Sequence, residues 1–274
     1  MKVQQPLSAL PSLLSQKRKL FIGVVHLLPL PGSPRWGGGV IAVIARAVAD
    51  ARAYEHGGAD AVIVENFGDA PFTKGAVPSE TVAAMAAAGA AVREAVRIPV
   101  GFNVLRNDAR SALGLCAACG GSFIRVNVHC GAMLTDQGVI EGQAFDTLRR
   151  RSELCPGVVL LADVHVKHAV PLAHMPIETA ARDTLERGLA DGLILSGTGT
   201  GQTTDLEDAR RVRAACPQAR LYIGSGVTRR NVTEYLRLVD GVIVGSSLKL
   251  HGKVAYRVDG RRVAALARII ARAR

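Results

Sequence analysis

The chain has 274 residues, of which 49% are hydrophobic and 21% charged, a composition typical of a globular protein with a sizeable core. No apolar run approaches the roughly 18 residues of a membrane span, and an odd number of cysteines, five, argues against a disulfide scaffold and for a reducing, cytoplasmic location. A formal charge of +11 suits an anionic partner, but aromatic residues make up only 4%, too few for base-stacking platforms, so nucleic acid is not expected.

Short apolar runs that are typical of buried strands alternate with helix-like segments along the chain. The predicted strands span residues 20–25, 59–64, 98–102, 122–128, 158–164, 192–195, 221–223 and 242–244. Amphipathic or alanine-rich patterns predict helices over residues 41–55, 78–96, 108–119, 142–154, 177–188, 206–215, 228–239 and 261–274. Residues 1–18 are expected to form a flexible extension, and residues 19–274 a single domain.

The eight strand–helix repeats predict a parallel sheet, and the fold class that we expect is α/β, a (β/α)₈ TIM barrel. An open, doubly wound sheet would show the same alternation. That fold is expected to carry its glycine fingerprint after the first strand. Here the first strand is followed by His26, Pro29 and Pro31, and the prolines disfavour such a turn. The barrel is therefore favoured.

Turns rich in glycine and serine follow the last three predicted strands. Because glycine has no Cβ, the main chain can approach an anion closely, and converging N–H groups can bind a phosphate. In TIM barrels the loops after strands seven and eight commonly form the phosphate site. The predicted phosphate-binding residues are Ser196, Gly197, Gly224, Ser225, Gly226, Gly245, Ser246 and Ser247.

Polar and charged residues gather where the other predicted strands end. On the fourth and fifth strands they recur with a period of two, so their side chains are expected to point to one side, toward the mouth of the barrel. The alternative is a structural layer of salt bridges that caps the barrel interior. The predicted catalytic residues are Asp163, His165, Lys167, Glu65, Asn103, Asn127 and His129, and the predicted substrate-binding residues are His26, Arg106 and Arg125.

Several roles are open for the ionisable groups. Asp163 could orient His165 as a general acid or base. Alternatively, Glu65, Asp163 and His165 could share a divalent metal ion, the one cofactor that the sequence suggests. Lys167 could form a Schiff base, although a lysine near an anion more often pairs with it.

Two arginines and two long loops complete the predicted site. Arg106 and Arg125 carry the fork of donors that could clamp a carboxylate or a second phosphate. The loops over residues 32–39 and 130–142 are long enough to act as lids, with irregular packing at the rim as the alternative.

The ordered motifs of the chain resemble those of the BtpA/SgcQ family from about residue 20 to the end. The resemblance implies a TIM barrel related to ribulose-phosphate-binding enzymes. It also implies a link to photosystem I biogenesis on thylakoid membranes in cyanobacteria, although many members occur in organisms without photosystems. It assigns no catalytic residues. The matching segments include HLLPLPGSP (26–34), VENFGDAPF (64–72), PVGFNVLRNDA (99–109), FIRVNVHCGAMLTDQGVIEG (123–142), ADVHVKHA (162–169), ARDTLERGLADGLILSGTGTG (181–201), GSGVT (224–228) and DGVIVGSSLK (240–249).

Two functions from different classes follow. The leading prediction is an enzyme that acts on a small phosphorylated metabolite, as an isomerase, lyase or aldolase. The alternative is a non-catalytic assembly factor for photosystem I, peripheral on the cytoplasmic face of a membrane. In that case the arginine-rich segment 261–274 would make a weak contact with the anionic surface. A homo-oligomer remains open.

Overall fold

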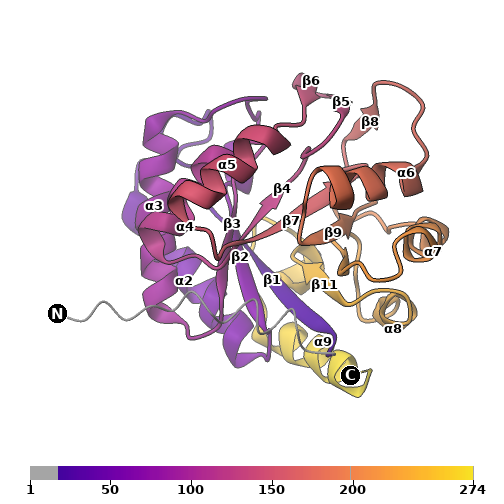
Figure 1. Ribbon diagram of the computed structural model, residues 1–274. Coiled ribbons are helices and arrows are strands. Elements are labelled where there is room, and N and C mark those ends of the chain that lie inside the picture. Colours follow the sequence, from indigo (N-terminus) through magenta and orange to yellow (C-terminus); the bar gives the residue numbers. More distant parts are fainter. Residues whose placement is uncertain (1–17, 198, 274) are drawn as a thin grey trace.

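Eight parallel strands close into a barrel in the computed structural model, which describes residues 18–197 and 199–273 (Figure 1). The order around the barrel is β1-β11-β10-β9-β7-β4-β3-β2, and β1 pairs with both β2 and β11. This closure confirms the predicted TIM barrel and excludes the open sheet. The barrel strands are β1 (Leu20–His26), β2 (Ala61–Glu65), β3 (Val100–Asn103), β4 (Phe123–Val126), β7 (Val159–Val164), β9 (Gly192–Leu195), β10 (Leu221–Ile223) and β11 (Gly241–Val244).

Helices surround the barrel, and each follows a strand in the chain (Figure 1). Three of them begin at an aspartate whose side chain accepts a hydrogen bond from a main-chain N–H of the first turn: Asp108, Asp205 and Asp259. The helices are α2 (Val40–His56), α3 (Ser79–Ala95), α4 (Ala109–Cys119), α5 (Ala144–Leu154), α6 (Ile177–Arg182), α7 (Leu206–Ala215), α8 (Val232–Leu236) and α9 (Gly260–Arg272). Shorter helical turns are η1 (Phe67–Asp69), η2 (Asp183–Arg187), η3 (Ser246–Leu248) and η4 (Leu250–Gly252).

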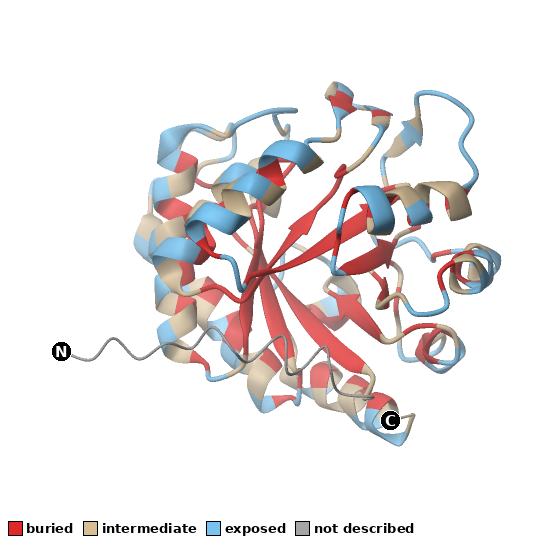
Figure 2. Ribbon diagram, viewed as in Figure 1, coloured by how far each residue is buried: buried red, intermediate tan, exposed pale blue. Residues whose placement is uncertain are grey.

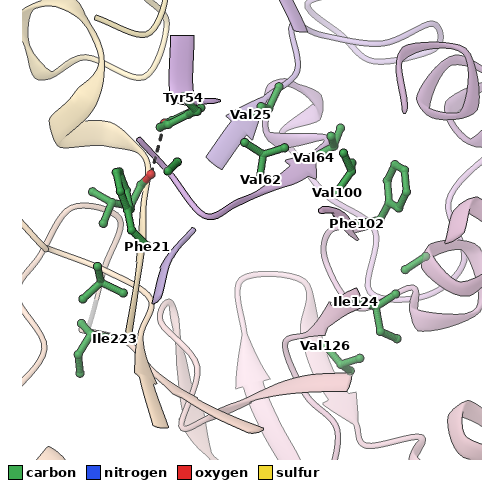
Figure 3. Close-up of a cluster of buried hydrophobic side chains, with 14 of the residues drawn as sticks. Phe21, Val25, Tyr54, Val62, Val64, Val100, Phe102, Ile124, Val126 and Ile223 are labelled. Carbon is green, nitrogen blue, oxygen red and sulfur yellow. Dashed lines mark hydrogen bonds between the residues drawn. The ribbon is translucent and has the colours of Figure 1, made fainter. Parts of the chain in front are cut away.

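The alternation of side chains along each strand divides the core in two. Phe21, Val62 and Phe102 point outward and pack with buried side chains of the helices, such as Tyr54 (Figure 3). The inward side chains form a separate buried cluster inside the barrel: Leu20, Ile22, Val24, Ala61, Ile63, Phe123, Val159, Leu161, Ile194, Tyr222 and Ile243. The strands are buried on both faces, whereas most helices have one exposed face (Figure 2).

The segment predicted as a lid over residues 130–142 is instead a hairpin. It consists of β5 (Ala132–Thr135) and β6 (Gly138–Glu141), and β5 also pairs antiparallel with β8 (Ala169–Pro171). The loops after β4 and β7 therefore form a small three-stranded sheet beside the barrel mouth (Figure 1).

Two further predictions concern the length of a segment. The helix expected over residues 228–239 is α8, which covers only Val232–Leu236. The predicted N-terminal extension lies outside the described residues except for Arg18, which forms an ion pair with Asp60 at 3.2 Å. Within residues 18–197 and 199–273, no helix combines the length and apolar character that crossing a membrane would require.

Candidate functional site

Polar side chains, four of them ionisable, occupy the inward positions at the carboxyl ends of five neighbouring barrel strands. His26 on β1 is level with Glu65 on β2, which is in turn level with Asn103 on β3. Arg125 on β4 and Asp163 on β7 continue the inward series of Phe123 and Leu161. These positions follow from the period of two, because every second side chain of a strand faces the barrel axis.

Arg125 lies at the centre of this layer. Its Nε and Nη2 atoms each donate to one oxygen of Asp163 at 2.9 Å, and its Nη1 atom lies 3.5 Å from Oε1 of Glu65. Burial opposes the charged guanidinium, but the charges and hydrogen bonds of Asp163, together with Glu65, raise the pKa of Arg125 above its ordinary value. Arg125 is therefore a fully paired buried cation.

The Asp163 carboxylate is also saturated by amide and hydroxyl donors. Asn127 donates to Oδ2 at 2.9 Å and Ser196 donates to Oδ1 at 3.2 Å, in addition to the two bonds from Arg125. Asn103 donates in turn to Oδ1 of Asn127 at 3.0 Å. The carboxylate thus holds the ends of β4, β7 and β9 together, and its oxygens are already engaged within the protein.

A cavity of about 190 Å³ joins this charged layer to the glycine turns. We call it the glycine cavity. The turns after β10 and β11 line it together with His26, Glu65, Arg125 and Lys167. Its lining comprises Val24, His26, Glu65, Arg125, Lys167, Thr200, Gly201, residues 224–228, residues 243–247 and Gly252.

The glycine turns leave main-chain donors unused. The N–H groups of Ser225, Gly226, Ser246 and Ser247 have no acceptor among residues 18–197 and 199–273. Gly226 has φ +69°, and a Cβ there would lie 2.2 Å from the carbonyl oxygen of Gln202. Only glycine fits this turn without strain. Unused N–H groups beside a cavity are a suitable environment for an anion.

Two titratable groups of the glycine cavity, Lys167 and His26, form no ion pair shorter than 4.0 Å with the described residues. Burial, and after it the charge of Arg125, lower the pKa of Lys167, while the charge of Glu65 opposes this shift. The side-chain nitrogen of Lys167 has no hydrogen-bond partner in the described chain. Burial and then Lys249 lower the pKa of His26 well below its ordinary value, so this imidazole is neutral at pH 7.

A second cavity, of about 160 Å³, adjoins the first and shares Glu65, Arg125, Lys167 and Thr200 with it. We call it the arginine cavity, after Arg106. Its remaining lining residues are Phe67, Phe72, Asn103, Leu105, Arg106, Asn127, Asp136 and His168.

His165 does not join this group, contrary to the prediction that Asp163 orients it. The strand β7 ends at Val164, and His165 adopts φ +50°, so the alternation of side chains breaks at this residue. His165 lines a third, largely apolar cavity of about 270 Å³ with Met133 and Leu172, which Asp163 and Asn127 also border, and its buried Nε2 atom has no hydrogen-bond partner among the described residues. Burial is the main cause that lowers the pKa of His165.

The predicted metal ligands Glu65, Asp163 and His165 are not assembled. In the part of the chain that the structure describes, no group of three or more His, Cys, Asp or Glu side chains could hold a metal ion. Arg125 pairs with both carboxylates, and His165 faces another cavity. A cation in their place would require Arg125 to move away.

Besides His165, four predicted residues are absent from the lining of the two cavities of the mouth: Asp163, His129, Ser196 and Gly197. His129 donates from Nε2 to the main-chain carbonyl of Gly188 at 2.7 Å and thereby ties the end of β4 to η2. Ser196 binds Asp163, and Gly197 packs against the carbonyl oxygen of Gln202, where a Cβ would lie at 2.5 Å.

Other lining residues were missed in the sequence. Thr200 and Gly201 contribute to the glycine cavity from the turn after β9, a few positions beyond the predicted Ser196 and Gly197. Phe67 and Phe72 line the arginine cavity, and Phe67 also packs against His26 with ring centroids 4.8 Å apart. Both phenylalanines lie within VENFGDAPF, one of the family-like segments, which was a usable signal.

Taken together, the mouth offers an anion-binding turn region, a partly desolvated lysine, a neutral histidine and a carboxylate around one cavity. Groups of this kind can transfer protons to and from a bound anionic molecule. The arrangement has the features by which active sites are recognised, namely a concave cavity with perturbed titratable groups.

Known proteins of similar sequence and structure identify the family. Residues 17–272 match the BtpA family. The chain is 52% identical over 244 residues to the photosystem I biogenesis protein BtpA of Synechocystis sp., with 89% of this chain and 85% of that protein covered. It is 34% identical to the putative sgc region protein SgcQ of Escherichia coli, with 89% and 91% covered.

Among solved structures, phosphoribosyl anthranilate isomerase from Thermus thermophilus superimposes with a TM-score of 0.57 at 15% identity, with 93% of this chain and 100% of that chain covered. This likeness supports the TIM-barrel fold alone. The family match and the two relatives confirm the resemblance seen in the sequence motifs. The chain therefore belongs to the BtpA family.

Proposed function

We propose that this protein is an enzyme that binds a small phosphorylated metabolite in the glycine cavity and moves a proton on it. The observation that carries the proposal is the set of N–H groups of Ser225, Gly226, Ser246 and Ser247, which have no acceptor among the described residues and belong to turns that line the same cavity as Lys167. Phosphate is the anion that such a set of main-chain donors and a lysine bind best in proteins.

Proton transfer is assigned to the titratable groups that line the cavity with the turns. Lys167 has a lowered pKa, and its side-chain nitrogen has no hydrogen-bond partner among residues 18–197 and 199–273, so it can both contact an anionic substrate and exchange a proton. Glu65 and neutral His26 lie beside it as a second acid–base pair, with Nε2 of His26 4.0 Å from Oε2 of Glu65. Many isomerase, lyase and aldolase reactions include such a proton transfer.

The phosphate part of the proposal predicts a specific loss in the Gly226→Ala variant. A Cβ at this position would clash with the Gln202 carbonyl and strain a backbone with φ +69°. In isothermal titration calorimetry we expect glycerol 3-phosphate to bind the wild-type protein and glycerol not to bind. The Gly226→Ala variant should bind glycerol 3-phosphate with an affinity at least tenfold lower than that of the wild type.

The matched control for this titration is Gly120→Ala. Gly120 ends α4 with φ +70°, and nothing lies within 4 Å of its hypothetical Cβ, so the substitution imposes the same backbone strain away from the cavity. Its affinity should equal that of the wild-type protein. If glycerol 3-phosphate fails to bind the wild type, or binds Gly226→Ala equally well, the proposed phosphate site is wrong.

A second candidate function rests on the name of the Synechocystis relative, which links it to photosystem I biogenesis. In this case the chain would be an assembly factor that contacts an anionic membrane surface. The exposed arginines of α9, namely Arg261, Arg268 and Arg272, are the residues that would make the contact. Each basic residue near such a surface contributes about 1 kcal/mol.

For this candidate we expect the protein to sediment with phosphatidylglycerol-containing vesicles at low salt, and to stay in solution when the three α9 arginines are changed to Gln. A control variant removes the same charge elsewhere, by Arg110→Gln, Arg149→Gln and Arg210→Gln, at exposed positions on α4, α5 and α7. Equal sedimentation of the two variants, or none by the wild type, would count against the membrane role.

A further inference from the structure

Arg106 is a buried cation without an acidic partner. Only 3% of its surface is exposed, yet it forms no ion pair with a carboxylate among the residues that the structure describes. Its Nη2 atom donates to the main-chain carbonyl of Lys167, and its Nε atom has no acceptor. Burial lowers the pKa of Arg106, and Asp163 only partly opposes it. Arg125, by contrast, pairs with two carboxylates.

A buried guanidinium with unused donors is energetically unfavourable unless an anion neutralises its charge and accepts its hydrogen bonds. Asp136 lines the same cavity from the turn between β5 and β6, but it is exposed, and its carboxylate accepts a hydrogen bond from the side chain of Gln137. Asp136, the carboxylate that lines this cavity besides Glu65, therefore forms no ion pair with Arg106. This makes a ligand the natural source of the missing negative charge.

The surroundings of Arg106 define what that ligand group looks like. Phe67 and Phe72 contribute apolar walls to the arginine cavity, with their ring centroids 6.4 Å apart. Asn103 adds a buried Oδ1 atom that has no hydrogen-bond donor. A group that fits here is small and partly apolar, carries one negative charge for Arg106, and offers one hydroxyl to Asn103.

We infer that the substrate is a phosphorylated hydroxy acid, whose phosphate lies in the glycine cavity and whose carboxylate binds Arg106 in the arginine cavity. This inference rests on the proposed function. The two cavities share Glu65, Arg125, Lys167 and Thr200, so one molecule can span both and place its reacting carbon beside Lys167. The substrate is thus anionic at both ends.

The cavity favours a carboxylate over a second phosphate. Its lining contains no glycine turn of the kind found in the glycine cavity. Arg125 also lines it but already pairs with two carboxylates, so Arg106 is the guanidinium there with unused donors among the described residues. The planar fork of an arginine matches the two oxygens of a carboxylate without further help, whereas protein phosphate sites commonly add main-chain donors to the arginine.

The test compares 3-phosphoglycerate with glycerol 3-phosphate, two probes that differ only in a carboxylate and a hydroxymethyl group. In calorimetric titrations we expect the wild-type protein to bind 3-phosphoglycerate at least tenfold more tightly, since charge-assisted bonds to a buried arginine are strong. Arg106→Met should abolish this preference and leave the affinity for glycerol 3-phosphate within about threefold of the wild type. Arg110→Met, at an exposed position of α4, should change neither affinity.

Each outcome has a distinct meaning. If neither probe binds, the proposed phosphate site fails and takes this inference with it. If glycerol 3-phosphate binds but 3-phosphoglycerate binds no more tightly, the carboxylate inference is wrong and the phosphate site stands. If fructose 1,6-bisphosphate is preferred in an Arg106-dependent manner, the second anion is a phosphate. The comparison on the wild-type protein decides the question even if Arg106→Met does not fold.

Discussion

In the Arg125→Met variant we expect the free energy of unfolding to fall by about 3–5 kcal/mol, because two buried carboxylates lose the cation between them. Asp163 and Glu65 both lie deep in the barrel mouth, with side chains exposed by 0% and 4%. Methionine has a similar length but no positive charge. Urea denaturation at pH 7, followed by circular dichroism, measures the loss.

A surface pair provides the matched control for Arg125. Arg210 and Glu207 on α7 form an ion pair at 3.1 Å in which both side chains are more than half exposed. Arg210→Met should change the free energy of unfolding by less than about 0.5 kcal/mol. Adding Asp163→Asn to Arg125→Met should recover part of the loss. A loss below about 1 kcal/mol in Arg125→Met would mean that water reaches the carboxylates and that the layer is not a buried ion pair.

The Lys167→Met variant is expected to lose proton transfer. In D₂O, the wild-type enzyme should exchange the C–H proton next to the carbonyl of one member of a panel: dihydroxyacetone phosphate, ribulose 5-phosphate and fructose 6-phosphate. NMR follows the loss of that signal. Removing the general acid–base group should slow the exchange by about 10²–10⁴-fold. Stability should hardly change, because the Lys167 nitrogen has no hydrogen-bond partner in the described part of the chain.

Two companion variants separate charge from proton transfer. Lys167→Arg keeps the positive charge but cannot deprotonate near neutral pH, so it should be as slow in exchange as Lys167→Met. Lys253→Met removes an exposed lysine and should exchange at the wild-type rate. If exchange persists in Lys167→Arg, Lys167 binds the anion but does not transfer the proton. If the wild-type protein exchanges no member of the panel, proton transfer on these ketose phosphates is contradicted.

The fold could be predicted because its signals are local. The short apolar runs at residues 192–195 and 221–223 coincide with β9 and β10 as they stand in the structure. The period of two also predicted that Arg125 points toward the barrel mouth, and the ends of the first two predicted strands placed His26 and Glu65 there; all three line one cavity. Sequence analysis therefore succeeded wherever a regular strand determined the direction of a side chain.

The predictions were wrong where the backbone leaves the regular strand. His165 follows β7 by one residue, but its φ of +50° turns it into the apolar cavity. The hairpin β5–β6 was missed because its strands are short and partly exposed, and β5 pairs with β8, about 35 residues further along the chain. No apolar alternation marks such strands.

Pairing between distant charges was also invisible in the sequence. Lys249 and Asp50 form a fully buried ion pair at 2.7 Å, and Asp50 also accepts a hydrogen bond from the N–H of Val258. This pair anchors the segment that follows η3 and the glycine turn. Nothing in the local pattern around either residue distinguishes it from a surface charge.

By itself the sequence determined the eight strand–helix units, the inward faces of the strands and the glycine turns, because these depend on periodicity and on the conformational freedom of single residues. Only the tertiary structure decided which charges neutralise one another. Arg125 is satisfied by Asp163 and Glu65, whereas Arg106 has no carboxylate partner within residues 18–197 and 199–273. The energy of a buried charge depends on the groups that surround it in space, and these come from strands and loops far apart in the chain.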